Sequence, residues 1–196
     1  MRRTDTVLLE PHVNGTLQES EHTAYTARRI NPEVVRHDST RSVRDVNGRW
    51  RPVEIRRGEV RESGASERIE EETIHHTDVN GNLAVTETKV TRRSTANERE
   101  HEVIETYAPY PDGRPRADGR PPLSERVHRT TTATADGGRY TVEEVEARSL
   151  ISPSDPMRVI RRIVTTVRPI GADRWVTERQ VFEPDLNGRM QLVGNE

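Results

Sequence analysis

The chain has 196 residues and a mass of 22.4 kDa, and only 30% of its residues are hydrophobic, fewer than an ordinary globular core requires. Its 31 basic and 33 acidic residues nearly cancel, so no long-range field favours nucleic acid or anionic lipid. This composition argues against a compact enzyme. We expect no nucleic-acid partner, and no membrane insertion because no apolar run approaches the length of a membrane span.

Cysteine is absent, which excludes disulfides, thiolate nucleophiles and thiolate metal sites but leaves the redox compartment open. The first residues contain no apolar core of a signal peptide. A cytosolic protein, a mature secreted chain and an excerpt of a longer chain all fit this observation.

The dipeptide Asn-Gly recurs along the chain, and its first three copies are 33 residues apart. The four copies are Asn14-Gly15, Asn47-Gly48, Asn80-Gly81 and Asn187-Gly188. Between segments rich in Thr, Val and Ile, this dipeptide is the strongest local signal for a hairpin, because both turn residues need positive φ. A second series of turn signals lies midway between the copies. The sequence therefore predicts a meander of antiparallel hairpins with a repeat of about 33 residues and up to a dozen strands.

Centring each hairpin on its Asn-Gly pair predicts specific cross-strand neighbours. The favourable pairs are Thr6–Thr23, Asp38–Arg57, Arg41–Glu54, Glu72–Lys89, Thr73–Thr88 and His75–Thr86. Each such pair contributes about 0.2 to 1 kcal/mol, so a long ladder can hold a sheet that buries little. One predicted pair, Arg68–Arg93, is unfavourable.

Neither face of the expected strands is uniformly apolar. In residues 83–90, strict alternation places Leu83 and Val85 on the same face as Glu87 and Lys89. A thick sandwich needs one apolar face per strand. We therefore expect an all-β fold, a long antiparallel β-hairpin meander that forms a single-layer sheet or a thin sandwich.

Residues 109–122 interrupt the repeats with a run rich in proline and glycine. Proline cannot donate to a strand ladder, so this segment is expected to be an exposed loop or a linker. Its Tyr and Arg residues also make it a candidate for contacting a partner. The expected organisation is N-terminal hairpin repeats in 1–108, the loop or linker in 109–122, and C-terminal hairpin repeats in 123–196.

Side chains with catalytic or metal-binding potential do not form a recognisable site. His75 and His76 are adjacent, so on a strand they point to opposite faces and cannot chelate one ion. Neighbouring glutamates, as in 70–72 and 143–144, are split between faces in the same way and are better explained by pairing with arginine. Residues 78–82 resemble the start of a calcium loop but lack its later glutamate. We expect no catalytic residue, no metal site and no cofactor.

The turn motif resembles that of known repeat proteins. Residues 78–83, Asp-Val-Asn-Gly-Asn-Leu, are similar to the Tyr-Asp-x-x-Gly-Asn-Leu motif of the RHS or YD-repeat family, whose hairpins spiral into large shells. The repeat here is longer than in that family, and Thr77 stands in place of the tyrosine. Over nearly the whole chain, the polar hairpin repeats resemble uncharacterised bacterial surface and fibre proteins. This resemblance implies an extracellular or cell-surface structural protein.

The two ends of the expected meander are apolar strands that no neighbour covers. Such edges recruit further strands, so we expect a self-associating subunit of an extracellular fibre or surface layer, joined edge to edge into a homo-oligomer or filament. The alternative is a monomeric binding module or spacer of a surface adhesin, with an unidentified cell-surface partner. The expected assembly-edge residues are Val7, Leu8, Leu9, Met190, Leu192 and Val193.

Overall fold

A computed structural model describes residues 1–11, 16–64, 66–78, 80–109, 121–149, 156–171 and 173–195. These residues form twelve strands and no helix. The strands are β1 (Arg2–Pro11), β2 (Leu17–Asn31), β3 (Val34–Arg44), β4 (Trp50–Ser63), β5 (Glu67–Thr77), β6 (Leu83–Ala96), β7 (Arg99–Tyr107), β8 (Leu123–Ala133), β9 (Arg139–Ala147), β10 (Arg158–Pro169), β11 (Trp175–Pro184) and β12 (Met190–Asn195).

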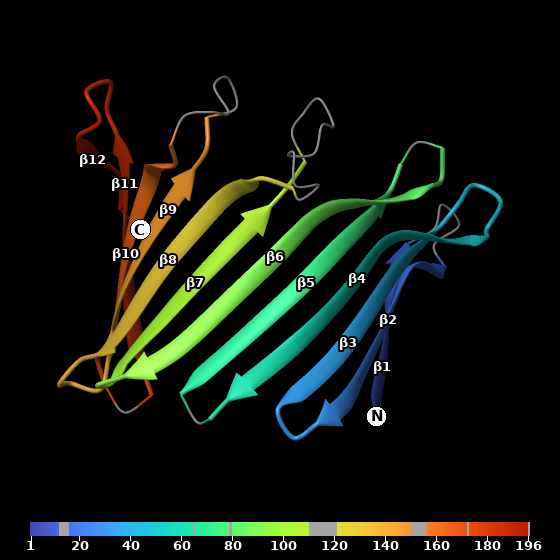
Figure 1. Cartoon of the computed structure of the whole chain (residues 1–196), viewed down its shortest axis with the longest axis horizontal. Helices are drawn as coiled ribbons and strands as arrows, with labels where there is room; N and C mark the ends of the chain where they lie inside the picture. The colour runs from blue at the N-terminus through green and yellow to red at the C-terminus, as the bar shows by residue number, and fades with distance from the viewer. Residues whose placement is uncertain are drawn as a thin grey trace.

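All twelve strands lie in one open sheet in chain order, and each is antiparallel to the next (Figure 1). The all-β hairpin meander expected from the Asn-Gly spacing is confirmed. β7 and β8 pair directly, so the sheet is continuous from one side of residues 109–122 to the other. Most of that loop or linker, residues 110–120, lies outside the described residues, as does the turn expected at Asn14-Gly15.

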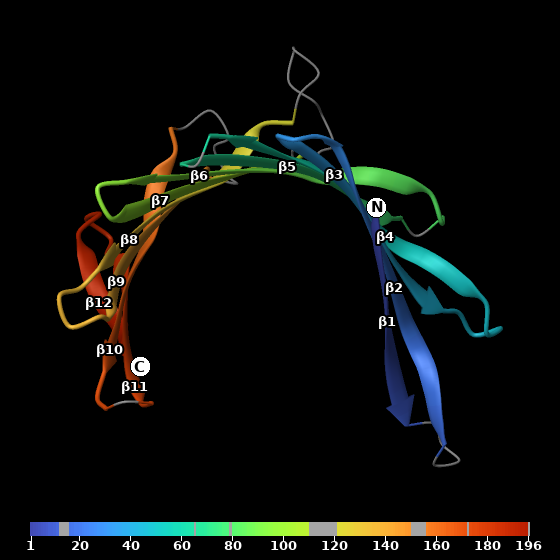
Figure 2. The same ribbon diagram turned by 90° about the horizontal axis from the view of Figure 1, so that it is seen from below.

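The sheet is a single layer that bends into an arch, with β1 and β12 at its two free edges (Figure 2). Because no second layer packs on the described sheet, a side chain can be buried only by its neighbours on the same face. Among the described residues, the buried large apolar side chains are Val60, Ile74, Val145 and Ile163. The fold therefore depends on its strand ladder more than on a hydrophobic core.

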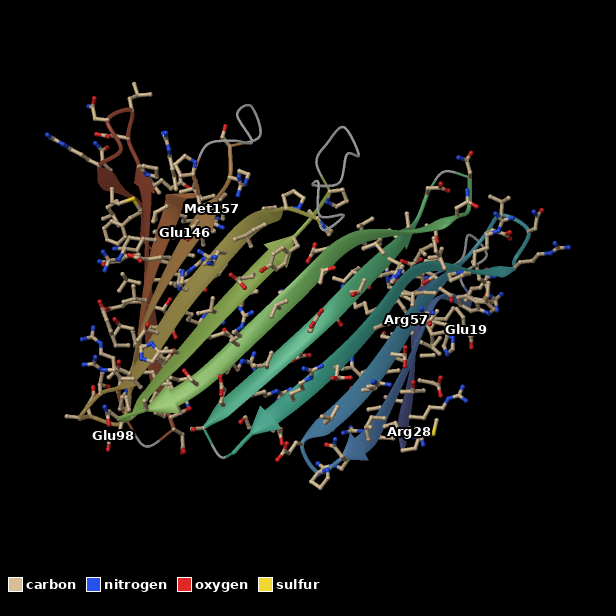
Figure 3. All side chains as sticks on the ribbon, in the orientation of Figure 1. Glu19, Arg28, Arg57, Glu98, Glu146 and Met157 are labelled. Carbon is tan, nitrogen blue, oxygen red and sulfur yellow. The ribbon has the colours of Figure 1, made fainter. Side chains whose placement is uncertain are left out.

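The two faces of the sheet differ in crowding. Two residues that pair directly on neighbouring strands have their side chains on the same face of the sheet. Following the pairs from β3 to β10 shows that the four buried apolar residues lie on one face, together with the buried His37 and Glu102. We call this the inner face, since bending a single layer crowds the side chains on its concave side. The other, outer face carries the buried Glu105. Charged side chains cover the sheet along its whole width (Figure 3).

The turns with the sequence Asp-x-Asn-Gly share one structure. The N–H of Gly48 donates to the carbonyl of Asp45 (2.9 Å), and Oδ1 of Asp45 accepts the N–H groups of Asn47 and Arg49 (2.9 Å each). Gly48 has a φ of +75°, which glycine adopts without strain. The turns after Asp78 and Asp185 repeat these bonds. The turns after Asp45 and Asp185 are each a type I turn followed by a left-handed glycine, a three-residue loop and not the predicted two-residue turn.

The predicted register is nevertheless confirmed away from the turns. The observed pairs include Thr6–Thr23, Asp38–Arg57, Arg41–Glu54, Glu72–Lys89, Thr73–Thr88 and Arg68–Arg93. In the β3–β4 hairpin the three-residue loop shifts the pairing by one residue, and one β-bulge shifts it back. The β1–β2 and β5–β6 hairpins contain a bulge at the equivalent place. The same kind of bulge occurs in each hairpin formed by an odd-numbered strand and the next even-numbered strand, from β1–β2 to β11–β12. The bulge residues are Ser20, Val53, Thr86, Ser124, Ile160 and Val193.

These bulges overturn two predictions. His75 pairs with Val85 and not with Thr86, because Thr86 is the bulge residue. For the same reason strict alternation fails within β6, and Leu83 and Val85 lie on the face opposite to Glu87 and Lys89. A bulge also bends its strand and increases the local twist. Six bulges at equivalent positions on the even-numbered strands account for the regular bend of the arch (Figure 2).

Candidate interaction surfaces

β1 forms one free edge of the sheet, and its apolar centre is exposed. Val7, Leu8 and Leu9 have exposed fractions of 43%, 51% and 50%. Leu8 lies on the inner face, and its two neighbours lie on the outer face. The strand contains no lysine, the residue that most often protects an edge from association.

β12 forms the opposite edge and carries no charged residue. Met190, Leu192 and Val193 have exposed fractions of 36%, 53% and 58%. This strand pairs only with Gln180–Pro184 of β11, so the outward backbone of residues 175–178 has no partner strand among the described residues. The edge predicted from the sequence consists of Met190, Leu192 and Val193 and does not include this second uncovered stretch.

The inner face carries a row of alternating charges that crosses four strands. Glu102 of β7 is the centre of this row and is 5% exposed. Its carboxylate accepts hydrogen bonds from Nε of Arg93 on β6 (2.5 Å) and from Nη1 of Arg129 on β8. Arg129 continues the row by donating to Glu143 of β9 through Nε (2.9 Å) and Nη2 (2.7 Å). These bonds satisfy a carboxylate that the sheet itself has buried. Removing it leaves Arg93 and Nη1 of Arg129 without this acceptor, while Arg129 keeps its bonds to Glu143.

The outer face has a second row on the same strands. Glu105 accepts Nη1 of Arg92 (2.6 Å), Nη2 of Arg126 (2.9 Å) and the hydroxyl of Tyr107 (3.1 Å). Burial raises the pKa of the Glu105 carboxyl, but these three hydrogen bonds outweigh the burial, and the resulting pKa lies below its usual value of 4.5. Glu105 therefore stays ionised at neutral pH.

Other carboxyls are held ionised by local bonds. The backbone N–H of Arg49, with that of Asn47, lowers the pKa of Asp45, and the N–H groups of Asn82 and Asn80 lower that of Asp78. On β4, the guanidinium of Arg56 lowers the pKa of Glu54.

These lowered pKa values predict acid sensitivity. A carboxyl whose pKa is lower in the folded than in the unfolded state stabilises the fold above its unfolded pKa, and this contribution disappears as the pH falls through the folded pKa. We expect the urea midpoint to be level from neutral pH down to the usual carboxyl values of 4.5 and 3.8, and to fall below them. Glu105→Gln should make the fall shallower. A loss of stability that is complete above pH 4.5 would contradict this account.

A stacked aromatic pair covers the one glycine in the middle of a central strand. His37 is 7% exposed and lies across Gly58, its partner on β4, while the ring of Tyr25 stacks on His37 at a centroid distance of 6.1 Å. Nε2 of His37 lies 3.5 Å from Oε1 of Glu70. A Cβ on residue 58 would lie 2.3 Å from Nε2 of His37, so this arrangement needs glycine. We assign it a structural role, the filling of a gap in the inner face.

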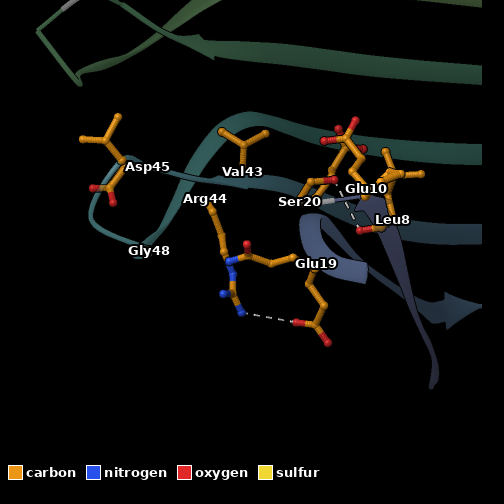
Figure 4. Close-up of a pocket in the computed structure, with 12 residues that line it drawn as sticks. Leu8, Glu10, Glu19, Ser20, Val43, Arg44, Asp45 and Gly48 are labelled. Atoms are coloured by element: carbon orange, nitrogen blue, oxygen red, sulfur yellow. Dashed lines mark hydrogen bonds and ion pairs between the residues drawn. The ribbon is translucent and has the colours of Figure 1, made fainter. Parts of the chain in front are cut away.

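A hollow of about 570 Å³ lies between the β1–β2 and β3–β4 hairpins (Figure 4). Arg44 and Glu19 form an ion pair of 3.6 Å at this hollow, and Ser20 donates to the carbonyl of Leu8 (3.4 Å). Both charged side chains are at least one-third exposed. Neither side chain of this ion pair is therefore desolvated.

The histidines are distributed as predicted, with His75 and His76 on opposite faces of β5. His76 contacts Oε2 of Glu54 (2.9 Å) and the hydroxyl of Thr86 (2.9 Å). Among the described residues, no three His, Asp or Glu side chains converge as a metal site requires. In the same part of the chain, no helix has the length and apolar character to cross a membrane.

No protein-family model, curated protein or solved structure matches the chain. The features of the described sheet that can contact a partner are its two uncovered edges and its two charged faces.

Proposed function

We propose that the chain is a structural, self-associating β-repeat subunit of an extracellular fibre or surface layer, and that its copies join edge to edge by strand addition. The observation that carries this proposal is a single-layer sheet with two uncovered edges, each with exposed apolar side chains. Strand addition satisfies the free backbone groups of an edge and covers apolar side chains beside it.

The strand order gives the assembly a polarity. Twelve antiparallel strands leave β1 and β12 running in opposite directions. β12 of one copy can therefore lie beside β1 of the next with both copies in the same orientation, and the antiparallel alternation continues. The two edges are different surfaces, so this contact is heterologous and propagates unless rotation closes a ring.

The proposal also accounts for the small core. A 196-residue chain that buries four large apolar side chains among its described residues gains little from the hydrophobic effect. Contact between the β1 edge and the β12 edge covers Leu8, Leu9 and Leu192, all of which are about half exposed in one copy.

Light scattering and negative-stain microscopy of the purified chain test this proposal. The unmodified chain should form particles much larger than 22.4 kDa. Removal of residues 190–196 should abolish them and leave the central hairpins folded. Successive N–H groups along a strand point to opposite sides, so one of the two residues Val7 and Leu8 directs its N–H away from β2. Proline at that residue removes an outward donor without disturbing the β1–β2 ladder. Whichever of Val7→Pro and Leu8→Pro has this effect should also stay monomeric.

Leu83→Lys is the matched control, because Leu83 is 43% exposed on an interior strand. This variant should assemble normally. A folded, unmodified chain that stays monomeric at high concentration would refute the proposal, and the monomeric binding module or spacer would then take its place.

A further inference from the structure

The Asn-Gly turns carry a dipeptide that is open to chemical modification. Asparagine is thermolabile, and a following glycine has no side chain to obstruct the approach of its backbone nitrogen. In deamidation this nitrogen loses its proton and bonds to Cγ of asparagine, while the side-chain amide nitrogen takes up a proton and leaves as ammonia. Water then opens the resulting succinimide ring to aspartate or to isoaspartate. Asn47 and Asn187 are both exposed, so water reaches both side chains.

Isoaspartate at either position would alter a hairpin. It adds one methylene group to the backbone of the turn, and the pairing of two hairpin strands depends on the length of the turn between them. The turn at Asn47 joins two interior strands, β3 and β4, and the turn at Asn187 joins β11 to the edge strand β12. Correct pairing therefore requires that these asparagines stay unmodified.

The nitrogen that would attack is already hydrogen-bonded in both turns. The N–H of Gly48 donates to the carbonyl oxygen of Asp45 (2.9 Å). In the same way, the N–H of Gly188 donates to the carbonyl oxygen of Asp185 (2.9 Å). The glycine nitrogen must lose its proton before it can bond to Cγ, so the reaction cannot proceed while this hydrogen bond is kept.

The backbone of the two asparagines is also turned away from the reactive geometry. Asn47 and Asn187 are the third residues of their type I turns, a position where ψ is about 0°. At this angle the glycine nitrogen eclipses the backbone nitrogen of the asparagine and not its Cβ. A five-membered succinimide ring needs the glycine nitrogen on the side of Cβ. The peptide between asparagine and glycine must therefore rotate out of the turn before the ring can close.

The aspartate side chain opposes this rotation. Oδ1 of Asp45 accepts the N–H groups of Asn47 and Arg49, at 2.9 Å each, and these two groups lie on either side of the peptide that must rotate. Oδ1 of Asp185 makes the same two bonds in its turn, at 2.8 and 2.9 Å. The aspartate therefore holds both ends of the reactive segment.

We propose that Asn47 and Asn187 are latent deamidation sites, protected while the aspartate two residues earlier holds the turn and reactive when the turn opens. Each aspartate thus controls a covalent modification in addition to shaping the hairpin. The inference does not depend on edge-to-edge assembly, because the bonds that carry it lie within single turns.

Peptide mapping by mass spectrometry tests the protection. The folded chain and the same chain unfolded in urea are incubated at one mildly alkaline pH, and the fraction converted to aspartate or isoaspartate is followed at each asparagine. Asn47 and Asn187 should convert about tenfold or more slowly in the folded chain, since a hydrogen bond and the turn geometry must both be lost first. Equal rates in the folded and the unfolded chain would overturn the proposal.

Substitution of the aspartate separates its role from that of the sheet. Asp45→Ala should raise the rate at Asn47 about tenfold and leave the rate at Asn187 in the same sample unchanged. Asp185→Ala should have the converse effect. Asp45→Asn is the matched control, because its side-chain oxygen can still accept both N–H groups, and its rate at Asn47 should stay close to that of the unmodified chain. An unchanged rate at Asn47 in Asp45→Ala, or an equal rise at both asparagines, would assign the protection elsewhere and refute the proposal.

Discussion

Glu102→Ala is expected to lower the free energy of unfolding by about 2 kcal/mol. Glu102 is the buried centre of the inner-face charge row, and its two oxygens accept bonds from Arg93 and Arg129. Removing one partner of a buried ion pair costs about 3 to 5 kcal/mol when the other charge remains buried. The arginine side chains here are 46% and 40% exposed, so water compensates in part and the expected loss is smaller.

Urea unfolding followed by circular dichroism measures this loss. Glu100→Ala is the matched control, because Glu100 lies on the same strand and the same face but is exposed. Its effect should stay within about 0.5 kcal/mol. Equal effects of the two variants would mean that the charge row contributes nothing specific to the fold.

Gly58→Ala is expected to destabilise the sheet by about 1 to 3 kcal/mol, although alanine is normally the better strand residue. The new Cβ would lie 2.3 Å from Nε2 of His37 and 3.0 Å from the carbonyl oxygen of Glu71. The imidazole must leave its place, and with it the stacking on Tyr25 and most of its burial are lost.

A double-mutant cycle distinguishes this contact from a general effect of residue 58. With His37→Ala in place, the shortest contact of the new methyl group is gone and only the 3.0 Å approach to the Glu71 carbonyl oxygen remains, so the double variant should be nearly as stable as His37→Ala alone. Simple additivity of the two losses would show that the histidine does not occupy the space above Gly58.

Much of the meander can be read from the sequence, because a hairpin is a local structure. The Asn-Gly spacing and the residues on either side set the positions of the turns, and complementary pairs such as Arg41–Glu54 and Glu72–Lys89 indicate the register. The edge residues follow directly from the strand order, since the first and last strands of a meander have one neighbour each.

The bulges were beyond sequence reasoning. The predicted register agrees with the observed one only because two one-residue errors cancel: the turn is one residue longer than expected, and a bulge such as that at Thr86 removes the difference. The extra turn residue and the bulge each shift the pairing by one residue, in opposite directions. Far from the turn, the paired residues are therefore the same whether both features are present or both are absent. Near the turn the difference moves Leu83 and Val85 to the other face.

Turn positions and strand order were thus determined by the sequence alone, through contacts between residues close along the chain. The tertiary structure decided which charges are buried, because the burial of Glu102 depends on arginines from two neighbouring strands and on the bend that brings their side chains together. It also decided that Gly58 must be glycine, since the ring of His37 reaches it from the neighbouring strand. Both outcomes depend on side chains that reach across from neighbouring strands, so neither can be read from a single segment of the chain.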